Sequence, residues 1–360
     1  MEARVTDMRE KLARRARLTL FGVAAAVAAA GALAPVGEAA DPGRWTQVNA
    51  TTLPLYYYQG MTVDPARHVY FDGIFFGLYK TDPQLNEIAR NDTVIPPEVA
   101  LREGYDHIGD LAWSPGGANG RLLLPLECYY PIPGAPYKGN TCPAEDLESG
   151  ELIPGTGAIG VADAGSLQWQ YYVKLNETRI RKTMWAEISP DEKLLWTQGG
   201  QGAQEGGPGG DLLAYSVGKI SPENAAPDGA AINAVRKLKG VVPLGADGKP
   251  LAITGATFYG ERMYVAVQEK QLFRVYSLDV DRCSPVTFCE RRLEIERTVT
   301  GESEGLATGC ILNGVLHWQI QPYNTSGLPT YGLVNGMLLT FVPADGRGLE
   351  GDTPVQCGGA

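Results

Sequence analysis

One short pattern recurs along this chain and constrains its fold more than any other feature. In its clearest copy, Glu304 and Gly305 open a short apolar strand, and a turn at Leu312–Gly314 leads to a second strand at Val315–Gln319. Weaker copies of the same strand–turn–strand pattern begin at Gln59, His107, Trp185 and Ile253. Five such strand pairs, each joined by a tight turn, predict an all-β repeat protein.

The residues after each copy extend the pair to a four-stranded unit. Third and fourth strands are predicted at 77–80 and 86–90, 158–162 and 168–173, 211–215 and 234–238, and 272–276 and 292–297. Repeated four-stranded sheets are typical of a β-propeller, so we predict a propeller of five four-stranded blades, with six blades as the alternative.

The fifth copy has a third strand at 337–342 but no clear fourth strand. Residues 45–49, near the other end of the chain, are predicted to supply it, because closure by the opposite terminus removes an exposed sheet edge. A C-terminal helix in that position is the alternative.

Two long insertions interrupt the strand pattern. Residues 127–157 are rich in proline and glycine and contain two cysteines, and a loop of this length in a compact domain is usually functional or disordered. Residues 199–210 are dense in glycine but lack the Gly-Lys-Ser/Thr ending of a phosphate-binding loop, so a mobile linker is predicted there.

The first 40 residues have the layout of an export signal. Arginines at 14, 15 and 17 precede an apolar run at 18–34, which is followed by small residues at 37–40. This layout predicts a secretory signal peptide, by a twin-arginine or a general route, cleaved after Ala39 or Ala40. The alternative is an uncleaved membrane anchor, for which the run is short. We therefore expect residues 41–360 to form a single secreted or cell-envelope domain without stable membrane insertion.

The charge and the cysteines narrow the class of protein further. A formal net charge of −10 excludes a nucleic-acid partner bound through its phosphates. All six cysteines follow the predicted signal, and an even number in an exported chain favours disulfides over metal ligation. Proximity in the sequence suggests the pairs Cys128–Cys142 and Cys283–Cys289, which leaves Cys310–Cys357 among the fifteen possible pairings.

In a propeller the first strand of each blade lines the central channel, so the residues that open these strands are expected to converge on one entrance. Those residues are Gln59, Asp106, His107, Asp110, Glu187, Thr254 and Glu304. Carboxylate and amide oxygens suit a hard cation such as calcium. The predicted metal ligands are Gln59, Asp110, Glu187 and Glu304.

The other residues at the entrance are assigned to ligand binding or to catalysis. Asp106 and Thr254 are candidate ligand-binding residues, and His107 is a candidate general base. Tyr129 and Tyr130 lie beside Cys128 and are candidates for a platform that binds a sugar or another flat ligand, with core packing as the alternative. A competing interpretation is that the channel residues only bond one another and trapped water.

The strand openings Gln59-Gly60 and Glu304-Gly305-Leu306-Ala307 resemble those of calcium-dependent propellers of the senescence-marker/gluconolactonase kind, and of related phytase-like and NHL-type propellers. The resemblance covers the repeat pattern and two or three residues in each blade. It implies a divalent cation held in the channel by Glu304 and, less directly, by Gln59 and Glu187. It also implies hydrolysis of lactones or phosphoesters.

Three functions are compatible with these patterns, and the sequence does not decide whether the protein is an enzyme. The first is a binding propeller that recognises a small molecule, a glycan or an extracellular protein at the polar entrance. The second is a metal-dependent hydrolase of the lactonase or phosphoesterase type, with Glu304, Glu187 and Asp110 as ligands and His107 as base. The third is a structural interaction module of the cell envelope. Ser303 and Glu304 are not expected to form the nucleophile elbow of a serine hydrolase.

Overall fold

The computed structural model describes residues 37–38, 44–54, 56–73, 77–128, 157–178, 183–200, 209–283, 289–322, 335–344 and 357. The chain divides into two units, Met1–Ala34 and Pro35–Ala360, and all described residues belong to the second. Apart from 37–38, the predicted signal peptide lies outside the described residues, and so do nearly all of the insertions at 127–157 and 199–210. Within the described ranges, no helix has the length and apolarity needed to cross a bilayer.

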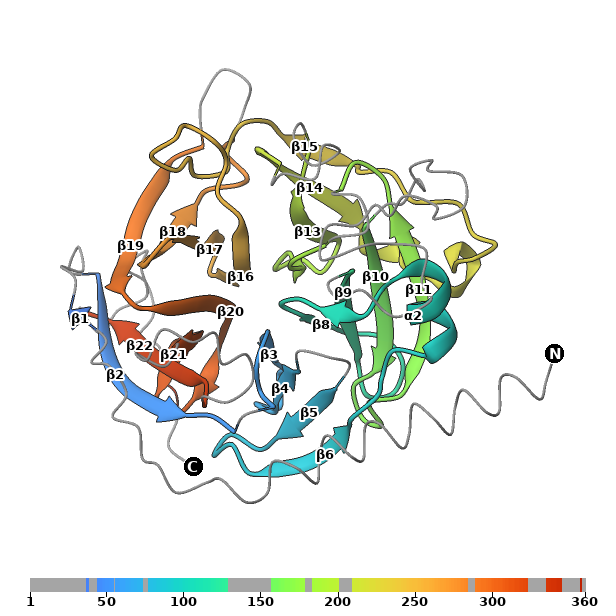
Figure 1. The fold of residues 1–360 in the computed structure, drawn as a ribbon, viewed down its shortest axis with the longest axis horizontal. Helices are drawn as coiled ribbons and strands as arrows, with labels where there is room; N and C mark the ends of the chain where they lie inside the picture. Colours follow the sequence, from blue (N-terminus) through green and yellow to red (C-terminus); the bar gives the residue numbers. More distant parts are fainter. Residues whose placement is uncertain are drawn as a thin grey trace. The chain divides into compact units, whose positions relative to one another are not determined.

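The described strands form five antiparallel sheets arranged around a common centre (Figure 1). Blade 1 contains β3 (Met61–Val63), β4 (Val69–Asp72), β5 (Leu78–Thr81) and β6 (Glu87–Asn91). Blade 2 contains β7 (His107–Ile108) and β8 (Ala112–Ser114), which both pair with β9 (Arg121–Glu127), then β10 (Gly157–Asp163) and β11 (Trp169–Leu175). Blade 3 contains β12 (Glu187–Ile188), β13 (Leu194–Gly199), β14 (Asp211–Ser216) and β15 (Arg236–Leu238).

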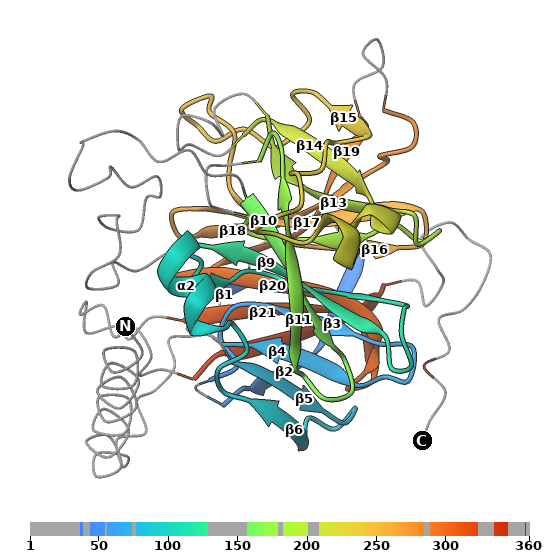
Figure 2. The ribbon, with the colours of Figure 1, turned by 90° about the vertical axis from the view of Figure 1, so that its right-hand side faces the viewer.

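Blade 4 contains β16 (Ile253–Tyr259), β17 (Arg262–Glu269), β18 (Leu272–Leu278) and β19 (Arg291–Thr298), with the short β1 (Gly37–Glu38) paired to β19. Blade 5 contains β20 (Gly301–Ile311), β21 (Gly314–Pro322), β22 (Met337–Pro343) and β2 (Trp45–Thr52). Helical structure in the described part of the chain is limited to α2 (Pro97–Glu103) and the 3-10 turns η1 (Val217–Lys219) and η2 (Pro222–Asn224). Val99 and Ala100 of α2 pack into a core cluster shared by blades 1 and 2. In Figures 1 and 2 the helix lies next to the strands of blade 2.

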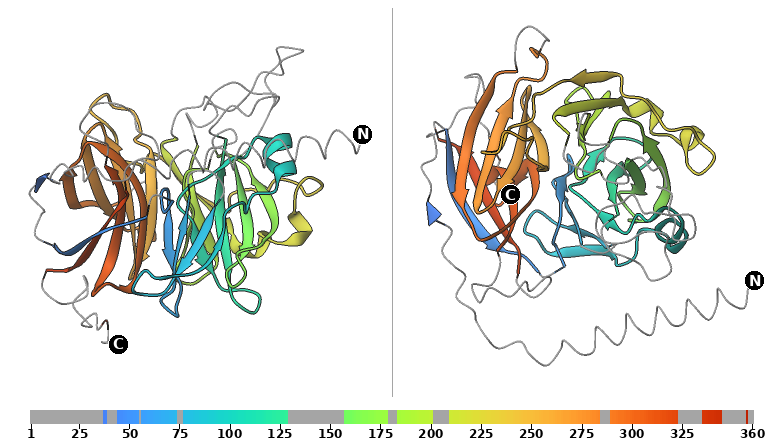
Figure 3. Two further views of the ribbon diagram at one scale, coloured as in Figure 1. Left: turned by 60° about the horizontal axis from the view of Figure 1, so that its bottom comes forward. Right: turned by 45° about the horizontal axis from the view of Figure 1, so that its top comes forward.

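The predicted fold is confirmed: the protein is an all-β propeller of five four-stranded blades. The six-blade alternative is wrong. The predicted closure by residues 45–49 is also confirmed, because β2 pairs with β22 from Trp45 opposite Pro343 to Thr52 opposite Met337. Figure 3 shows β2, in blue, along the outer side of the last sheet. The N-terminal strand thus covers an edge that β22 would otherwise expose.

One strand differs from its prediction. The sequence indicates a continuous first strand for blade 2, whereas the structure breaks it into β7 and β8. The break, at Gly109–Leu111, leaves Asp110 in an isolated parallel bridge with Trp185 of blade 3. The reason is that the backbone of Asp110 bonds to the neighbouring blade instead of to its own sheet.

Large apolar side chains fill the spaces between neighbouring blades. One cluster joins Tyr264 and Phe273 of blade 4 to Trp318 and Phe341 of blade 5. Trp185 and Trp196 of blade 3 pack in another cluster with residues of blade 4. Each of these side chains is 1% exposed or less, so they serve core packing between the blades.

Two of the predicted cysteine pairs are confirmed, namely Cys283–Cys289 and Cys310–Cys357. Cys128 is also disulfide-bonded, while Cys142, its predicted partner, lies outside the described residues.

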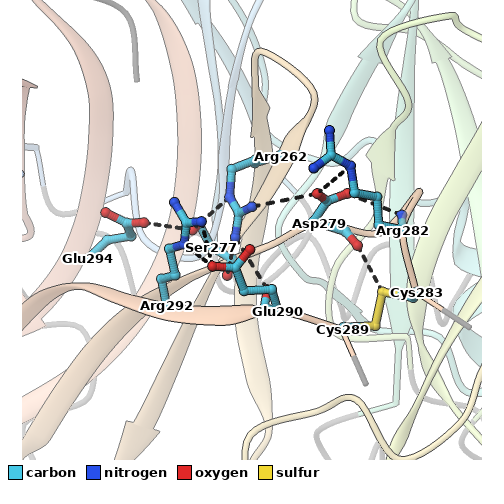
Figure 4. Close-up of polar contacts among 9 residues, drawn as sticks. All are labelled: Arg262, Ser277, Asp279, Arg282, Cys283, Cys289, Glu290, Arg292 and Glu294. Atoms are coloured by element: carbon cyan, nitrogen blue, oxygen red, sulfur yellow. Dashed lines mark hydrogen bonds and ion pairs between the residues drawn. A yellow bond between two sulfur atoms is a disulfide. The ribbon is translucent and has the colours of Figure 1, made fainter. Parts of the chain in front are cut away.

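A polar network joins the last three strands of blade 4 beside the Cys283–Cys289 disulfide (Figure 4). Nε of Arg262 donates to Oγ of Ser277 at 3.0 Å, and the Ser277 hydroxyl donates to Glu294 at 2.6 Å. Ser277 and Glu294 are 0% and 1% exposed. These bonds therefore hold β17, β18 and β19 together inside the sheet and offer no surface to a ligand.

Candidate functional site

The centre of the propeller is occupied by the side chain of Asp110, which is 1% exposed. Its Oδ1 atom accepts a hydrogen bond from the backbone N–H of Met61 at 3.0 Å. Its Oδ2 atom accepts from the backbone N–H groups of Ala256 at 3.0 Å and Leu306 at 3.3 Å. A single carboxylate of blade 2 therefore binds the innermost strands of blades 1, 4 and 5.

The backbone of Asp110 completes this set of contacts. Its N–H donates to the carbonyl of Met184 at 3.0 Å, and the N–H of Ala186 donates to the Asp110 carbonyl at 3.0 Å. Both partners belong to the segment that leads into blade 3. Asp110 is thus hydrogen-bonded to all four other blades. Burial raises the pKa of this carboxyl, while the three backbone N–H groups that it accepts from act in the opposite direction.

Glycines allow the inner strands to approach Asp110 this closely. A Cβ atom on Gly305 would lie 2.7 Å from both Oδ1 of Asp110 and the backbone N of Met61. A Cβ atom on Gly255 would lie 2.7 Å from the backbone N of Leu306, and one on Gly60 only 2.5 Å from Cα of Asp110. Side chains at these positions would clash with backbone. The recurring glycine in the sequence pattern therefore serves closure of the centre around Asp110.

The residues just before these glycines lie together on one side of Asp110. Nε2 of His107 is 2.9 Å from Oε1 of Gln59. Oγ1 of Thr254 donates to Oγ of Ser303 at 2.9 Å, and Ser303 precedes Glu304. We call this side the axial entrance and define it by Gln59, Asp72, His107, Thr254, Ser303 and Glu304.

Asp72 is the residue of the axial entrance that the sequence analysis missed. It ends the second strand of blade 1 and is 0% exposed. Its Oδ1 atom accepts from the N–H of Gly60 at 2.6 Å, whereas its buried Oδ2 atom has no hydrogen-bond partner among the described residues. Glu304, which is 7% exposed, has the same feature, because its Oε1 atom finds no partner within the described ranges.

A signal in the sequence could have found Asp72. The second strand of every blade has an acidic or amide side chain as its last or second-last residue. These residues are Asp72, Glu127, Gln198, Gln268 and Gln321. A search restricted to first strands misses them.

Burial and neighbouring acidic side chains raise the pKa values of the carboxyl groups at the axial entrance. Burial raises the pKa of Asp72, and the charges of Asp110 and Glu127 raise it further, while the Gly60 N–H opposes them. Burial also raises the pKa of Glu304, followed by the charge and hydrogen bond of Glu302 and by the charge of Asp72. The entrance therefore concentrates negative charge in a desolvated place, which favours the protonated form of these two groups.

Glu187 does not join this group. Its carboxylate accepts a hydrogen bond from the backbone N–H of Phe258, two residues beyond Ala256, which binds Asp110. Because Thr254 lies two residues before Ala256, Glu187 is on the opposite side of Asp110 from the axial entrance. Burial and the charge of Asp110 raise its pKa. The expected convergence of Glu187 with Glu304 is therefore not found.

The other sequence-predicted residues have varied positions. Asp106 is 2% exposed, and its N–H donates to the carbonyl of Glu127 beside His107. Tyr129 and Tyr130 lie outside the described residues. In the part of the chain that the structure describes, no three His, Cys, Asp or Glu side chains form a group that could hold a metal ion. The calcium site inferred from the sequence stays a prediction.

Ser303 lies in a sequence motif of serine hydrolases but not on the sharp turn that the motif forms in those enzymes. Gly301–Gly305 reads Gly-x-Ser-x-Gly, but Ser303 lies within β20 and not on a strand-to-helix turn. It is 1% exposed, and its Oγ atom accepts from Thr254 and from Nε1 of Trp318. The prediction that it forms no nucleophile elbow is confirmed.

The raised pKa of Glu304 predicts how stability depends on pH. A carboxyl whose pKa is raised by folding contributes stability that is fully present below its unfolded pKa, about 4, and is lost as pH rises through the folded value. We expect Glu304→Gln to remove this loss, so that the free energy of unfolding of the variant rises relative to that of the parent as the pH is raised from about 4 to about 8. Chemical denaturation across this pH range measures the difference. The exposed Glu261→Gln is the control, and parallel curves for Glu304→Gln and the parent would contradict the prediction.

Comparisons with known proteins add no family. No protein-family model matches the chain, and no curated protein sequence matches it. Among solved structures, the chain is similar to the β-xylosidase RS223, with 10% identity and a TM-score of 0.49 over 85% of this chain and 98% of the xylosidase. It is also similar to a GH43_1 enzyme from Xanthomonas citri (11% identity, TM-score 0.47, 84% and 92% covered) and to the glutaminyl cyclase of Myxococcus xanthus (9%, 0.42, 83% and 97%).

These values are too low to assign a family or an activity. The class of protein follows instead from the sheet topology, which defines a five-bladed β-propeller closed by its N-terminal strand. Its functional site has to be argued from its own residues.

Proposed function

We propose that this protein is an extracytoplasmic binding propeller, and that a ligand binds at the axial entrance by donating hydrogen bonds to buried oxygens of the protein. The observation that carries the proposal is the pair of buried oxygens, Oδ2 of Asp72 and Oε1 of Glu304, that find no partner among the described residues. A buried acceptor without a donor costs about 1–3 kcal/mol, so a ligand that supplies the donors recovers this free energy.

Charge supports the same conclusion. The pKa values of Asp72 and Glu304 are raised by neighbouring acidic groups as well as by burial. A desolvated place surrounded by one sign of charge raises the local concentration of oppositely charged ligands. The ligand is a small molecule, a glycan or an extracellular protein with a suitable donor group. Location outside the cytoplasm is supported by the Cys283–Cys289 and Cys310–Cys357 disulfides.

A second candidate is a metal-dependent hydrolase of the lactonase or phosphoesterase type at the same entrance. One observation favours it: carboxyl groups with raised pKa values, such as Glu304, are suited to general acid catalysis, and His107 lies in the same group of residues. If the protein is such a hydrolase, the parent turns over a lactone or a phosphoester, and His107→Ala abolishes that turnover. A binding protein shows no turnover to lose.

The binding function is tested by measuring the melting temperature of residues 41–360 with calcium chloride, butylguanidine, butylamine or xylose. We expect at least one of the three organic probes, which carry N–H or O–H donors, to raise the melting temperature of the parent, because ligand bound only to the folded state stabilises it. A rise with calcium chloride alone supports the metal-dependent candidate instead. The double variant Asp72→Asn, Glu304→Gln should lose this response. A parent that responds to none of the four probes, or a double variant that responds like the parent, contradicts the proposed function.

A further inference from the structure

A third buried acceptor lies beside the two that define the ligand site. Gln319, on β21, is 1% exposed, and its Nε2 atom donates to the carbonyl of Tyr57 at 2.8 Å. This bond fixes the orientation of the amide, and the Oε1 atom is left without a partner in the described part of the chain. The register of β20 and β21 places Gln319 opposite the bulge that contains Glu304. Three unpartnered acceptors therefore lie where blades 1 and 5 meet.

We infer that the axial entrance holds an organic cation with several N–H donors, namely a guanidinium or primary ammonium group. This inference rests on the proposed binding function and narrows its ligand. Each of the three oxygens, on Asp72, Glu304 and Gln319, needs a donor. A guanidinium carries five N–H donors and an ammonium three.

The distribution of the acceptors favours such a group over a metal ion. A metal requires its ligand atoms to converge on one point at about 2–2.6 Å, and the described acidic residues form no such group. The donors of a guanidinium point outward in a fork and reach oxygens that are spread apart. The entrance therefore matches a polyatomic cation better than a point charge.

The charge of the surroundings favours a cation over a neutral donor. Glu304 lies within electrostatic reach of Glu302, Asp72 and Glu127, and Asp72 within reach of Asp110. A cation stabilises the ionised form of these carboxyl groups, which burial otherwise disfavours, whereas a neutral hydroxyl bonds to one acceptor and leaves any ionised carboxylate uncompensated. A hydrogen bond to a charged donor is also about twice as strong as a neutral one.

The floor of the entrance limits the size of the anchored group. Asp110 and the glycines around it fill the centre, so a ligand cannot pass along the axis. Gln59, Thr254 and Glu302 are only partly buried, so the solvent-exposed rim of the entrance lies at these residues. The entrance thus fits the cationic end of a longer flexible chain, such as a lysine or arginine side chain or an alkylamine.

Isothermal titration of the full-length protein with butylguanidine, butylamine, the neutral 1-pentanol and calcium chloride tests this inference. We expect one of the two organic cations to bind at least about tenfold more tightly than 1-pentanol and than calcium. Its affinity should rise as the pH is raised, because a cation binds the ionised carboxylates and must displace their protons. Asp72→Asn and Glu304→Gln should each weaken binding at least about tenfold.

Glu187→Gln is the matched control, since Glu187 is also a carboxylate with a raised pKa, is partly buried, and lies on the opposite side of Asp110. Its affinity for the organic cation should equal that of the parent. Tighter binding of 1-pentanol, lost in Glu304→Gln, overturns the inference and leaves the proposed binding function intact. Tighter binding of calcium, lost in the same variant, overturns both, because a calcium ion carries no hydrogen-bond donor. A loss of binding in Glu187→Gln alone places the site elsewhere and overturns both the inference and the proposed binding function. A parent protein that binds none of the four probes overturns both as well. Melting curves of each variant separate lost binding from lost folding.

Discussion

Replacing Asp110 by alanine is expected to lower the free energy of unfolding by about 3–9 kcal/mol, or to prevent folding altogether. The substitution leaves the backbone N–H groups of Met61, Ala256 and Leu306 buried without their acceptor. Each orphaned donor costs about 1–3 kcal/mol. Because a whole domain is stable by only about 5–15 kcal/mol, the loss is large enough to abolish the folded state.

Chemical denaturation of the purified variant, or its yield of soluble protein, measures this effect. The stability of Asp110→Asn should lie between those of the parent and of Asp110→Ala, because the amide keeps one acceptor oxygen but turns an NH2 group toward a backbone donor. Asp191→Ala is the control, since Asp191 bonds only to nearby residues of a surface turn. An Asp110→Ala variant within about 1 kcal/mol of the parent would show that Asp110 does not join the blades.

Replacing Gly109 by alanine is expected to lower the free energy of unfolding by about 3 kcal/mol or more. The cause is a steric clash and not a lost hydrogen bond. The added Cβ would overlap the carbonyl group of Met184 and lie 2.9 Å from Oε1 of Glu127. The carbonyl of Met184 accepts the N–H of Asp110 and cannot move without breaking the contact between blades 2 and 3. The obstacle is backbone, so relaxation of side chains gives little relief.

Gly218→Ala provides the matched control for Gly109→Ala. An added Cβ at Gly218 would lie 3.7 Å from Oγ of Ser216, which is an ordinary van der Waals contact. Its free energy of unfolding should stay within about 0.5 kcal/mol of the parent. Equal stabilities of the two alanine variants in denaturant titrations would contradict the tight packing described for the centre.

Most strands were predictable because their signals are local. Alternation of apolar and polar residues and the turns at positions such as Asp64-Pro65 and Asn313-Gly314 mark strand pairs without knowledge of the fold. Closure by residues 45–49 was also predictable, because a blade with three strands requires a fourth and the chain has a suitable unassigned segment.

The candidate site was predictable only in part. The pairing of Gln59 with His107 and the position of Glu304 at the entrance follow from the repeated strand openings. The position of Glu187 does not, because where a residue lies along the axis depends on how far each blade is shifted relative to its neighbours. Asp72 and Gln319 were missed for a related reason, since second-strand residues reach the entrance only through their register with the first strand.

The sequence by itself determined that this chain forms five small sheets, that its ends meet in the last one, and that glycine recurs at the start of the inner strands. These properties follow from alternation, turns and repeat spacing, which act over a few residues. Only the tertiary structure decided that Asp110 links the blades through hydrogen bonds and that the side chains of Asp72, Glu304 and Gln319 lie close together. Those roles depend on hydrogen bonds between residues as far apart as Asp110 and Leu306, whose geometry is fixed by the packing of whole blades.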